Sequence, residues 1–164
     1  MKSASNSGDQ MVLITRTFDA PRALVFKAWS DPTHLQRWFA PRGCTLSHCV
    51  LDFRVGGKIH TCISTPQYGD CWCIGAYREI VPSERIVYTI SMSDAKGNLV
   101  ESPDAGKADD WPRDTVVTVT FAEDAGKTTL TLHQTVLESI ARRTGAYPSW
   151  LDMLDQLAEV LKTG

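Results

Sequence analysis

Residues 12–39, VLITRTFDAPRALVFKAWSDPTHLQRWF, decide the fold, because one extended run leads directly into two short helices that each begin at a proline. In the first seven residues, Val12, Ile14 and Phe18 share one register. Residues with β-branched side chains are frequent there, which is typical of a strand. This stretch therefore predicts a strand followed by a pair of helices.

Both predicted helices have a proline in their first turn. Proline lacks an N–H and has φ fixed near the helical value, so Pro21 suits the first position of a helix. Asp31 can cap the free N–H groups of the second helix, and Pro32 occupies its first turn. The apolar residues that follow at helical spacing are Leu24, Val25, Ala28 and Trp29, and then Leu35, Trp38 and Phe39.

The rest of the chain predicts antiparallel strands and a long final helix. Alternating polar and apolar residues predict strands at 44–54, 58–64, 71–81 and 85–93, and a hairpin over 114–136. The final helix carries apolar residues three and four apart, at Tyr147, Trp150, Leu151, Leu154, Leu157, Ala158 and Leu161. This order predicts an α+β fold with helices on one face of an antiparallel sheet.

Residues 94–112 interrupt the alternation of the strands. These nineteen residues are mostly polar or small. They exceed the length of about 12 to 15 residues at which unstructured loops become uncommon. Leu99, Val100 and Trp111 are apolar residues within this polar segment, so we interpret it as either a lid or a mobile loop.

Length and composition limit the number of domains and the kinds of partner that we expect. At 164 residues we expect a tail at 1–10 that is disordered and a single domain over 11–164. The 17 basic and 19 acidic residues are spread without blocks, which argues against a nucleic-acid partner. No apolar run approaches the roughly 18 residues of a membrane span, and 1–9 lack the core of a secretory signal. We therefore expect a cytoplasmic protein that has no membrane partner.

The five cysteines predict free thiols. An odd number in a chain with an ordinary core argues against a disulfide framework. Cys71-x-Cys73 and His60-x-Cys62 lie on strands that we expect to pair, which makes zinc an alternative. Zinc cysteines usually occur as C-x-x-C on a turn, whereas residues two apart on a strand are about 7 Å apart. We therefore predict structural thiols and no metal site.

No pattern typical of catalysis is present in the sequence. It contains neither G-x-S-x-G nor H-E-x-x-H, and its four histidines are scattered singly at His34, His48, His60 and His133. A lone strand histidine is more often a hydrogen-bonded structural residue than an acid or base. We therefore assign no catalytic residue, and enzymatic activity stays open.

Four segments of the chain resemble the AHSA1 (activator of Hsp90 ATPase homologue 1-like) domain of the START/Bet v 1-like, or SRPBCC, superfamily. Its strand ending in F-x-A-P, its tryptophan-bearing helix and its D-P-x-x-L-x-x-W match FDAP, Trp29 and DPTHLQRW. LDFRVGGK at 51–58 resembles its D-x-R-x-G-G turn, and GAYREIVPSERIVYT at 75–89 its strand pair. The tail GAYPSWLDMLDQLAEVL resembles its closing helix, so the resemblance covers about 12–162.

The resemblance implies a helix-grip fold, in which a strongly curved sheet wraps around the last helix and leaves a cavity between them. It also implies a small, largely apolar ligand and neither a metal nor a cofactor. Aromatic and leucine residues at these spacings are equally typical of a core. The candidate ligand-binding residues, with His133 as a polar contact, are Trp38, Phe39, Trp72, Tyr88, Met92, His133, Tyr147, Trp150 and Leu154.

Two other functions stay open beside ligand binding. The family name suggests a co-chaperone that activates an Hsp90-type ATPase in the stress response. In eukaryotic activators a separate amino-terminal domain contributes chaperone binding, whereas here about ten residues precede the first strand. The superfamily also includes polyketide cyclase-like enzymes, for which the sequence has no signature. Many family members associate, and an exposed strand edge leaves a homodimer open as well.

Overall fold

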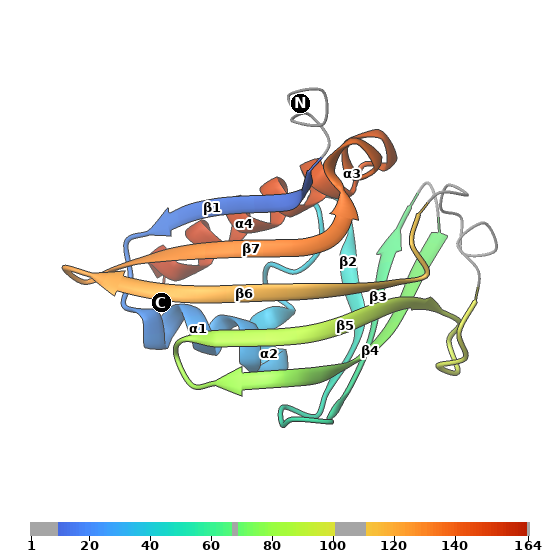
Figure 1. The fold of residues 1–164 in the computed structure, drawn as a ribbon, viewed down its shortest axis with the longest axis horizontal. Coiled ribbons are helices and arrows are strands. Elements are labelled where there is room, and N and C mark those ends of the chain that lie inside the picture. The colour runs from blue at the N-terminus through green and yellow to red at the C-terminus, as the bar shows by residue number, and fades with distance from the viewer. Residues whose placement is uncertain (1–9, 67–68, 101–110, 164) are drawn as a thin grey trace, which may run out of the picture.

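The computed structural model describes residues 10–66, 69–100 and 111–163. Its strands are β1 (Met11–Phe18), β2 (Thr45–Leu51), β3 (Lys58–Thr65), β4 (Gly69–Val81), β5 (Arg85–Ser93), β6 (Asp114–Asp124) and β7 (Lys127–Leu137). They form one curved antiparallel sheet in the order β1-β7-β6-β5-β4-β3-β2 (Figure 1). Strands β2 to β7 follow one another as a meander, and β1 joins the far edge by pairing with β7.

The described helices are α1 (Arg22–Ser30), α2 (Pro32–Leu35), α3 (Glu138–Thr144) and α4 (Ala146–Thr163). Helices α1 and α2 follow β1, and the long α4 lies across the concave face of the sheet (Figure 1). The predicted α+β helix-grip arrangement is therefore confirmed. None of the described helices combines the length and the apolar character needed to cross a bilayer.

The two prolines start the first helices in slightly different ways. The Asp31 carboxylate accepts a hydrogen bond from the backbone N–H of Thr33 at 2.9 Å, and Pro32 is the first residue of α2, as predicted. Pro21, by contrast, is the N-cap of α1, with an extended ψ of 151°. The predicted first helical position for Pro21 is therefore off by one residue, because its fixed φ suits a cap as well as a first turn.

The glycine pair between β2 and β3 is needed for two separate reasons. Gly56 has a φ of +85°, which L side chains rarely adopt. At Gly57 a Cβ atom would lie 1.8 Å from the carbonyl oxygen of Asp52, so only glycine fits. The Gly56 N–H donates to the Tyr77 carbonyl at 2.8 Å, and the Tyr77 N–H donates to Gly57 at 3.0 Å. The turn is therefore bound to the middle of β4.

Two predicted segments lie largely or partly outside the described residues. These are the tail at 1–10, of which only Gln10 is described, and residues 101–110 of the proposed lid. The described start of the lid segment is an ordered turn, since the Asp94 carboxylate accepts hydrogen bonds from the N–H groups of Lys96 and Asn98, both at 2.9 Å. These and other hydrogen bonds hold the pKa of Asp94 below its usual range.

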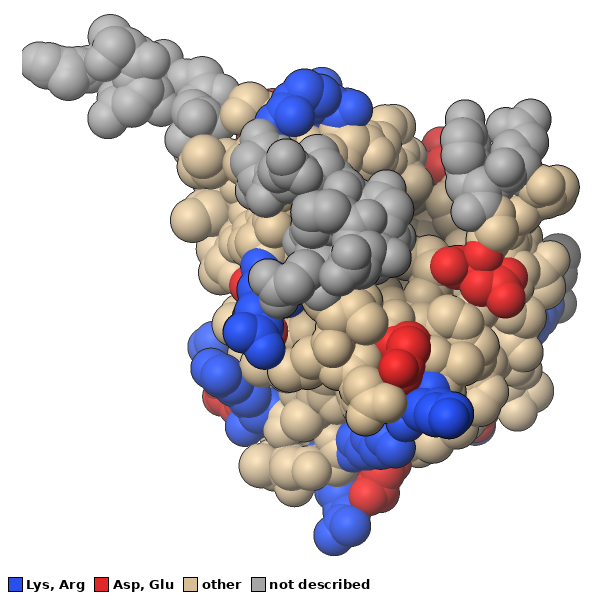
Figure 2. Space-filling view, turned by 90° about the vertical axis from the view of Figure 1, so that its right-hand side faces the viewer, with Lys and Arg blue, Asp and Glu red and all other residues tan. Residues whose placement is uncertain are grey.

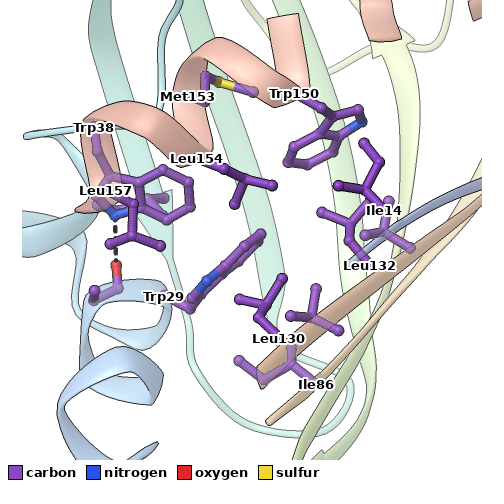
Figure 3. Close-up of a cluster of buried hydrophobic side chains, with 14 of the residues drawn as sticks. Ile14, Trp29, Trp38, Ile86, Leu130, Leu132, Trp150, Met153, Leu154 and Leu157 are labelled. Carbon is purple, nitrogen blue, oxygen red and sulfur yellow. Dashed lines mark hydrogen bonds between the residues drawn. The ribbon is translucent and has the colours of Figure 1, made fainter. Parts of the chain in front are cut away.

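Helix α4 buries the apolar stripe that its spacing predicted. Trp150, Leu154 and Leu157 are buried, and Met153 joins them although the predicted stripe omitted it (Figure 3). The outward face is bound to neighbouring elements by polar contacts. Arg16 pairs with Asp155 at 2.7 Å, and Arg42 pairs with both Asp152 and Glu159. Gln156 also donates to the Ala40 carbonyl at 2.7 Å.

Leu154→Ala and Asp155→Ala test the orientation of α4. Leu154 is fully buried, so its truncation should lower the free energy of unfolding by about 2 to 5 kcal/mol. Asp155 is exposed and contributes an ion pair at the surface, so its loss should cost less than about 1 kcal/mol. Urea unfolding of both variants measures the difference. Equal and small losses in both variants would mean that a different side of the helix faces the sheet.

Candidate functional site

A cavity of about 270 Å³ lies between the sheet and α4. Its wall comes from alternate residues of the middle strands, because side chains two apart on a strand share one face. On β5 these are Ile86, Tyr88, Ile90 and Met92, and on β3 they are Ile59, Thr61, Ile63 and Thr65. Cys71, Cys73 and Tyr77 continue the wall on β4, and Trp111 and Gln134 also line it. The concave face of the sheet thus forms most of the cavity.

Aromatic rings form the opposite wall. Trp29 of α1 and Trp150 of α4 stack with their ring centroids 6.2 Å apart and an interplanar angle of 26°. Phe39 packs edge-on against Trp150 at 5.8 Å. Trp38 lies behind these rings, 4.8 Å from Trp29, and its Nε1–H donates to the Ala28 carbonyl at 3.1 Å (Figure 3). The aromatic wall therefore joins α1, α4 and the segment after α2.

Gln134 is a buried polar residue that positions this wall. Its Oε1 accepts a hydrogen bond from Trp150 Nε1–H at 2.9 Å, and its Nε2 donates to Thr115 Oγ1 at 3.1 Å. A buried amide is costly unless its groups are hydrogen-bonded, and here both ends have a partner. Gln134 therefore fixes the indole of Trp150 at the edge of the cavity.

Tyr77 and Tyr88 form a cross-strand pair on β4 and β5, with ring centroids 6.4 Å apart. Both line the cavity, and both are buried. Burial raises the pKa of Tyr88 well above its usual range, and the nearby Tyr77 and Cys73 raise it further. Burial likewise raises the pKa of Tyr77, with a smaller contribution from Cys49. Both side chains are therefore neutral hydroxyl groups at neutral pH.

Four of the predicted site residues line the cavity together, namely Phe39, Tyr88, Met92 and Trp150. Two more are buried in the layer next to it. Trp38, 1% exposed, is bound to Ala28 behind the aromatic wall, and Leu154, fully buried, packs in the core (Figure 3). These two residues support the wall and do not face the cavity.

The other three predicted residues lie away from the cavity. Trp72 lies on the opposite face of β4 from Cys71 and Cys73, and its ring packs 5.2 Å from His48 and 5.1 Å from His60. His133 is on the face of β7 opposite Gln134, paired with Leu13 and Thr118. The Tyr147 ring instead stacks under the Arg142 guanidinium, 4.1 Å from ring centroid to Cζ. Strand alternation explains the first two displacements, and a local cation–π contact accounts for the third.

Tyr77, Gln134 and Met153 are among the lining residues that sequence reasoning missed. A signal existed for Gln134, because Leu130, Leu132 and Val136 alternate around it and place it on the inward face. Met153 lies three residues after Trp150 and one before Leu154, within the apolar stripe of α4. Tyr77 shares the inward face of β4 with Cys73, but that strand has apolar residues on both faces.

The cysteines and histidines that suggested zinc lie on opposite faces of the sheet. Cys71 and Cys73 face the cavity, and they pair in register with Ile63 and Thr61, which also line it. His60 and Cys62 alternate with those residues and therefore lie on the opposite face of the sheet, where both are buried. Among the described residues, no group of three or more suitable side chains could hold a metal ion. All five cysteines are free thiols.

The curved sheet wrapped around α4, with a largely apolar cavity between them, defines a helix-grip domain of the SRPBCC type. A family model described as "Activator of Hsp90 ATPase homolog 1-like protein" matches residues 19–162. The chain therefore belongs to the AHSA1 family. None of the curated proteins matches this chain.

Solved structures of bacterial proteins share the fold across nearly the whole chain. A protein of Chromobacterium violaceum is 28% identical, with a TM-score of 0.72 over 92% of this chain and 96% of that chain. A protein of Staphylococcus epidermidis is also 28% identical, with a TM-score of 0.72 over 93% and 89%. A protein of Rhizobium leguminosarum is 26% identical, with a TM-score of 0.71 over 95% and 96%. These likenesses agree with the family assignment.

Elemental analysis and thiol titration test the absence of metal and disulfides. Because the four suggested ligands point to opposite faces, the purified protein should contain clearly less than one zinc per chain. The unfolded, non-reduced protein should titrate as five thiols, the number of cysteines in the chain. One zinc per chain that is lost in a Cys73→Ser variant would contradict this prediction, as would a deficit of two thiols.

The protein should lose stability as the pH rises above about 9. Burial raises the pKa of Cys49 from its usual 9.0 to about 11, and it raises the pKa values of Tyr77 and Tyr88 above the usual 10.0 of a tyrosine. The unfolded chain releases these protons first and so binds fewer of them, which makes the free energy of unfolding fall with pH. The contribution is complete below pH 9 and is lost as the pH approaches the folded-state values.

Urea unfolding at several pH values between about 8 and 11 measures this slope. Tyr88→Phe and Cys49→Ser should each make it shallower, because each removes one of the shifted groups. Ile90→Val is the matched control, since it changes the same wall without an ionisable group and should lower every point equally. A Tyr88→Phe slope as steep as that of the wild type would contradict the assignment.

Proposed function

We propose that the protein binds a small, largely apolar molecule in the cavity between the sheet and α4. The observation that supports this proposal is the cavity itself, about 270 Å³ in volume and walled by aromatic and aliphatic side chains. Pockets with such walls and a few polar groups are typical small-molecule sites.

The polar groups of the wall favour binding over acid–base chemistry. Within the described residues, the cavity is lined by hydroxyls, thiols and the Gln134 amide, and by no histidine, carboxylate, lysine or arginine. Proton transfer in enzymes most often uses histidine or a carboxylate. This composition supports a carrier or sensor of an apolar molecule over a cyclase-like enzyme.

The family description provides a second candidate function, the activation of an Hsp90-type ATPase. Such an activity requires a surface that binds the chaperone, and it does not depend on the cavity. An ATPase assay with purified Hsp90 and this protein therefore addresses a separate property. Binding of a cavity ligand and stimulation of the ATPase can each be measured without the other.

Filling the cavity with a larger side chain tests the proposal. The wild-type protein should bind the neutral fluorescent probe N-phenyl-1-naphthylamine saturably in its native state. Ile90 lines the cavity, so Ile90→Trp should occupy ligand space and weaken probe binding at least about tenfold, or about 1.4 kcal/mol. The measurement is a fluorescence titration, with native mass spectrometry of the purified wild type to detect a retained small molecule.

Val87→Trp is the matched control for this experiment. Val87 is on the same strand but alternates with the lining residues Ile86 and Tyr88, so the new indole should lie on the other face. Probe binding should then be unchanged. Binding seen only under conditions that loosen the fold, or equal loss in both variants, would refute the cavity as a ligand site. ATPase stimulation without probe binding would instead favour the co-chaperone function.

A further inference from the structure

We infer that the cavity selects a neutral ligand that carries a carbonyl-like hydrogen-bond acceptor, and that the hydroxyls of Tyr77 and Tyr88 donate to it. This inference rests on the proposed function and specifies the chemistry of the ligand. It makes Tyr77 and Tyr88 the residues that determine specificity in an otherwise largely apolar site.

The two tyrosines form one polar spot in the wall. They are paired across β4 and β5, and both point to the concave face, at 5% and 7% exposure. Their ring centroids lie 6.4 Å apart. Because a carbonyl oxygen has two lone pairs, one acceptor can take a hydrogen bond from each phenol.

No protein group satisfies these two hydroxyls in the part of the chain that the structure describes. The other large polar groups nearby behave differently, since the Gln134 amide is hydrogen-bonded at both ends and the Trp38 indole donates to Ala28. A phenol hydroxyl that has no protein partner can donate to a ligand, so a ligand that accepts its hydrogen bond gains relative to a pure hydrocarbon. The two phenol hydroxyls are therefore available to donate to a ligand. The Trp29 indole also lines the cavity, and its Nε1–H is a buried donor without a partner among the described residues, so it can add a further hydrogen bond to the same kind of acceptor.

The charge of the wall decides between neutral and ionised ligands. No acidic or basic side chain lines the cavity within the described residues. Moving an ion out of water into such surroundings is very costly unless a partner charge compensates it. Two phenol hydroxyls can orient a carboxylate, but they cannot neutralise it. The cavity should therefore prefer a ketone, aldehyde, ester or similar neutral acceptor over a carboxylate of the same shape.

Three probes of nearly the same shape test this inference: 2-acetylnaphthalene, 2-isopropenylnaphthalene and 2-naphthoate. The first has a carbonyl where the second has a carbon–carbon double bond, and the third is charged. The wild-type protein should bind the ketone about three- to tenfold more tightly than the alkene, the range expected for one or two neutral hydrogen bonds. It should bind naphthoate most weakly. Calorimetric titration measures all three affinities.

Tyr77→Phe and Tyr88→Phe remove one hydroxyl each and keep the ring. Each variant should bind the alkene as the wild type does and lose most of the preference for the ketone. Tyr147→Phe is the matched control, because Tyr147 stacks on Arg142 away from the cavity and its loss should leave the preference unchanged. The infrared carbonyl band of the bound ketone should shift to lower frequency in the wild type and shift back in the variants.

The outcomes separate this inference from the proposed function. If the wild type binds the alkene and the ketone equally, or if both Phe variants keep the preference, the tyrosines do not select the ligand although the cavity still binds it. Tighter binding of naphthoate than of the ketone would overturn the neutral-ligand inference. If no aromatic probe binds the native protein, the proposed function itself fails. Should a Phe variant not fold, the infrared band of the ketone in the wild type decides alone.

Discussion

A single helix cannot cover the concave face of a seven-stranded sheet, and this mismatch shapes the whole molecule. Strands lie about 4.8 Å apart, so seven of them span about 29 Å, whereas a helix with its side chains is about 10 to 12 Å wide. Helix α4 covers one part of the face, and α1 and α2 cover another (Figure 1). The space that remains between them is the cavity, which is therefore a consequence of the architecture.

Such a space persists only if the elements around it cannot collapse into it. Ion pairs from Arg16 and Arg42 fix the outward side of α4, and Gln134 fixes Trp150 on its inward side. Figure 2 shows basic and acidic groups distributed over one face of the molecule without one sign dominating. The surface contacts are individually weak, so the stacked indoles of Trp29 and Trp150 contribute more to the position of the helix.

The order of helices and strands could be predicted from the sequence. Which residues of each strand face the cavity could be predicted for some strands and not for others. The period of α4 and the proline starts of α1 and α2 are strong local signals. On β4, however, Cys71, Cys73 and Tyr77 face inward while Trp72 and Ile74 alternate with them. Because both faces carry apolar residues, periodicity could not place Trp72, and only the register with β3 settles its side. On β7 the alternation of apolar residues indicates that Gln134 faces inward. His133 was predicted as the polar contact because of its residue type and not because of its position on the strand.

The glycine turn shows how a fold motif can also serve the site. Gly56 and Gly57 bind the backbone of Tyr77 through its carbonyl and its N–H, and Gly57 accepts no side chain because of the Asp52 carbonyl. Tyr77 is thereby held at one point of the curved sheet, opposite Tyr88. The Gly56-Gly57 turn, which the sequence predicts only as a reversal of the chain, thus also positions one of the few polar groups in the cavity wall. Proteins of this fold that bind different ligands are then expected to differ in the inward-facing side chains of their strands. The turn that positions these strands depends instead on backbone geometry.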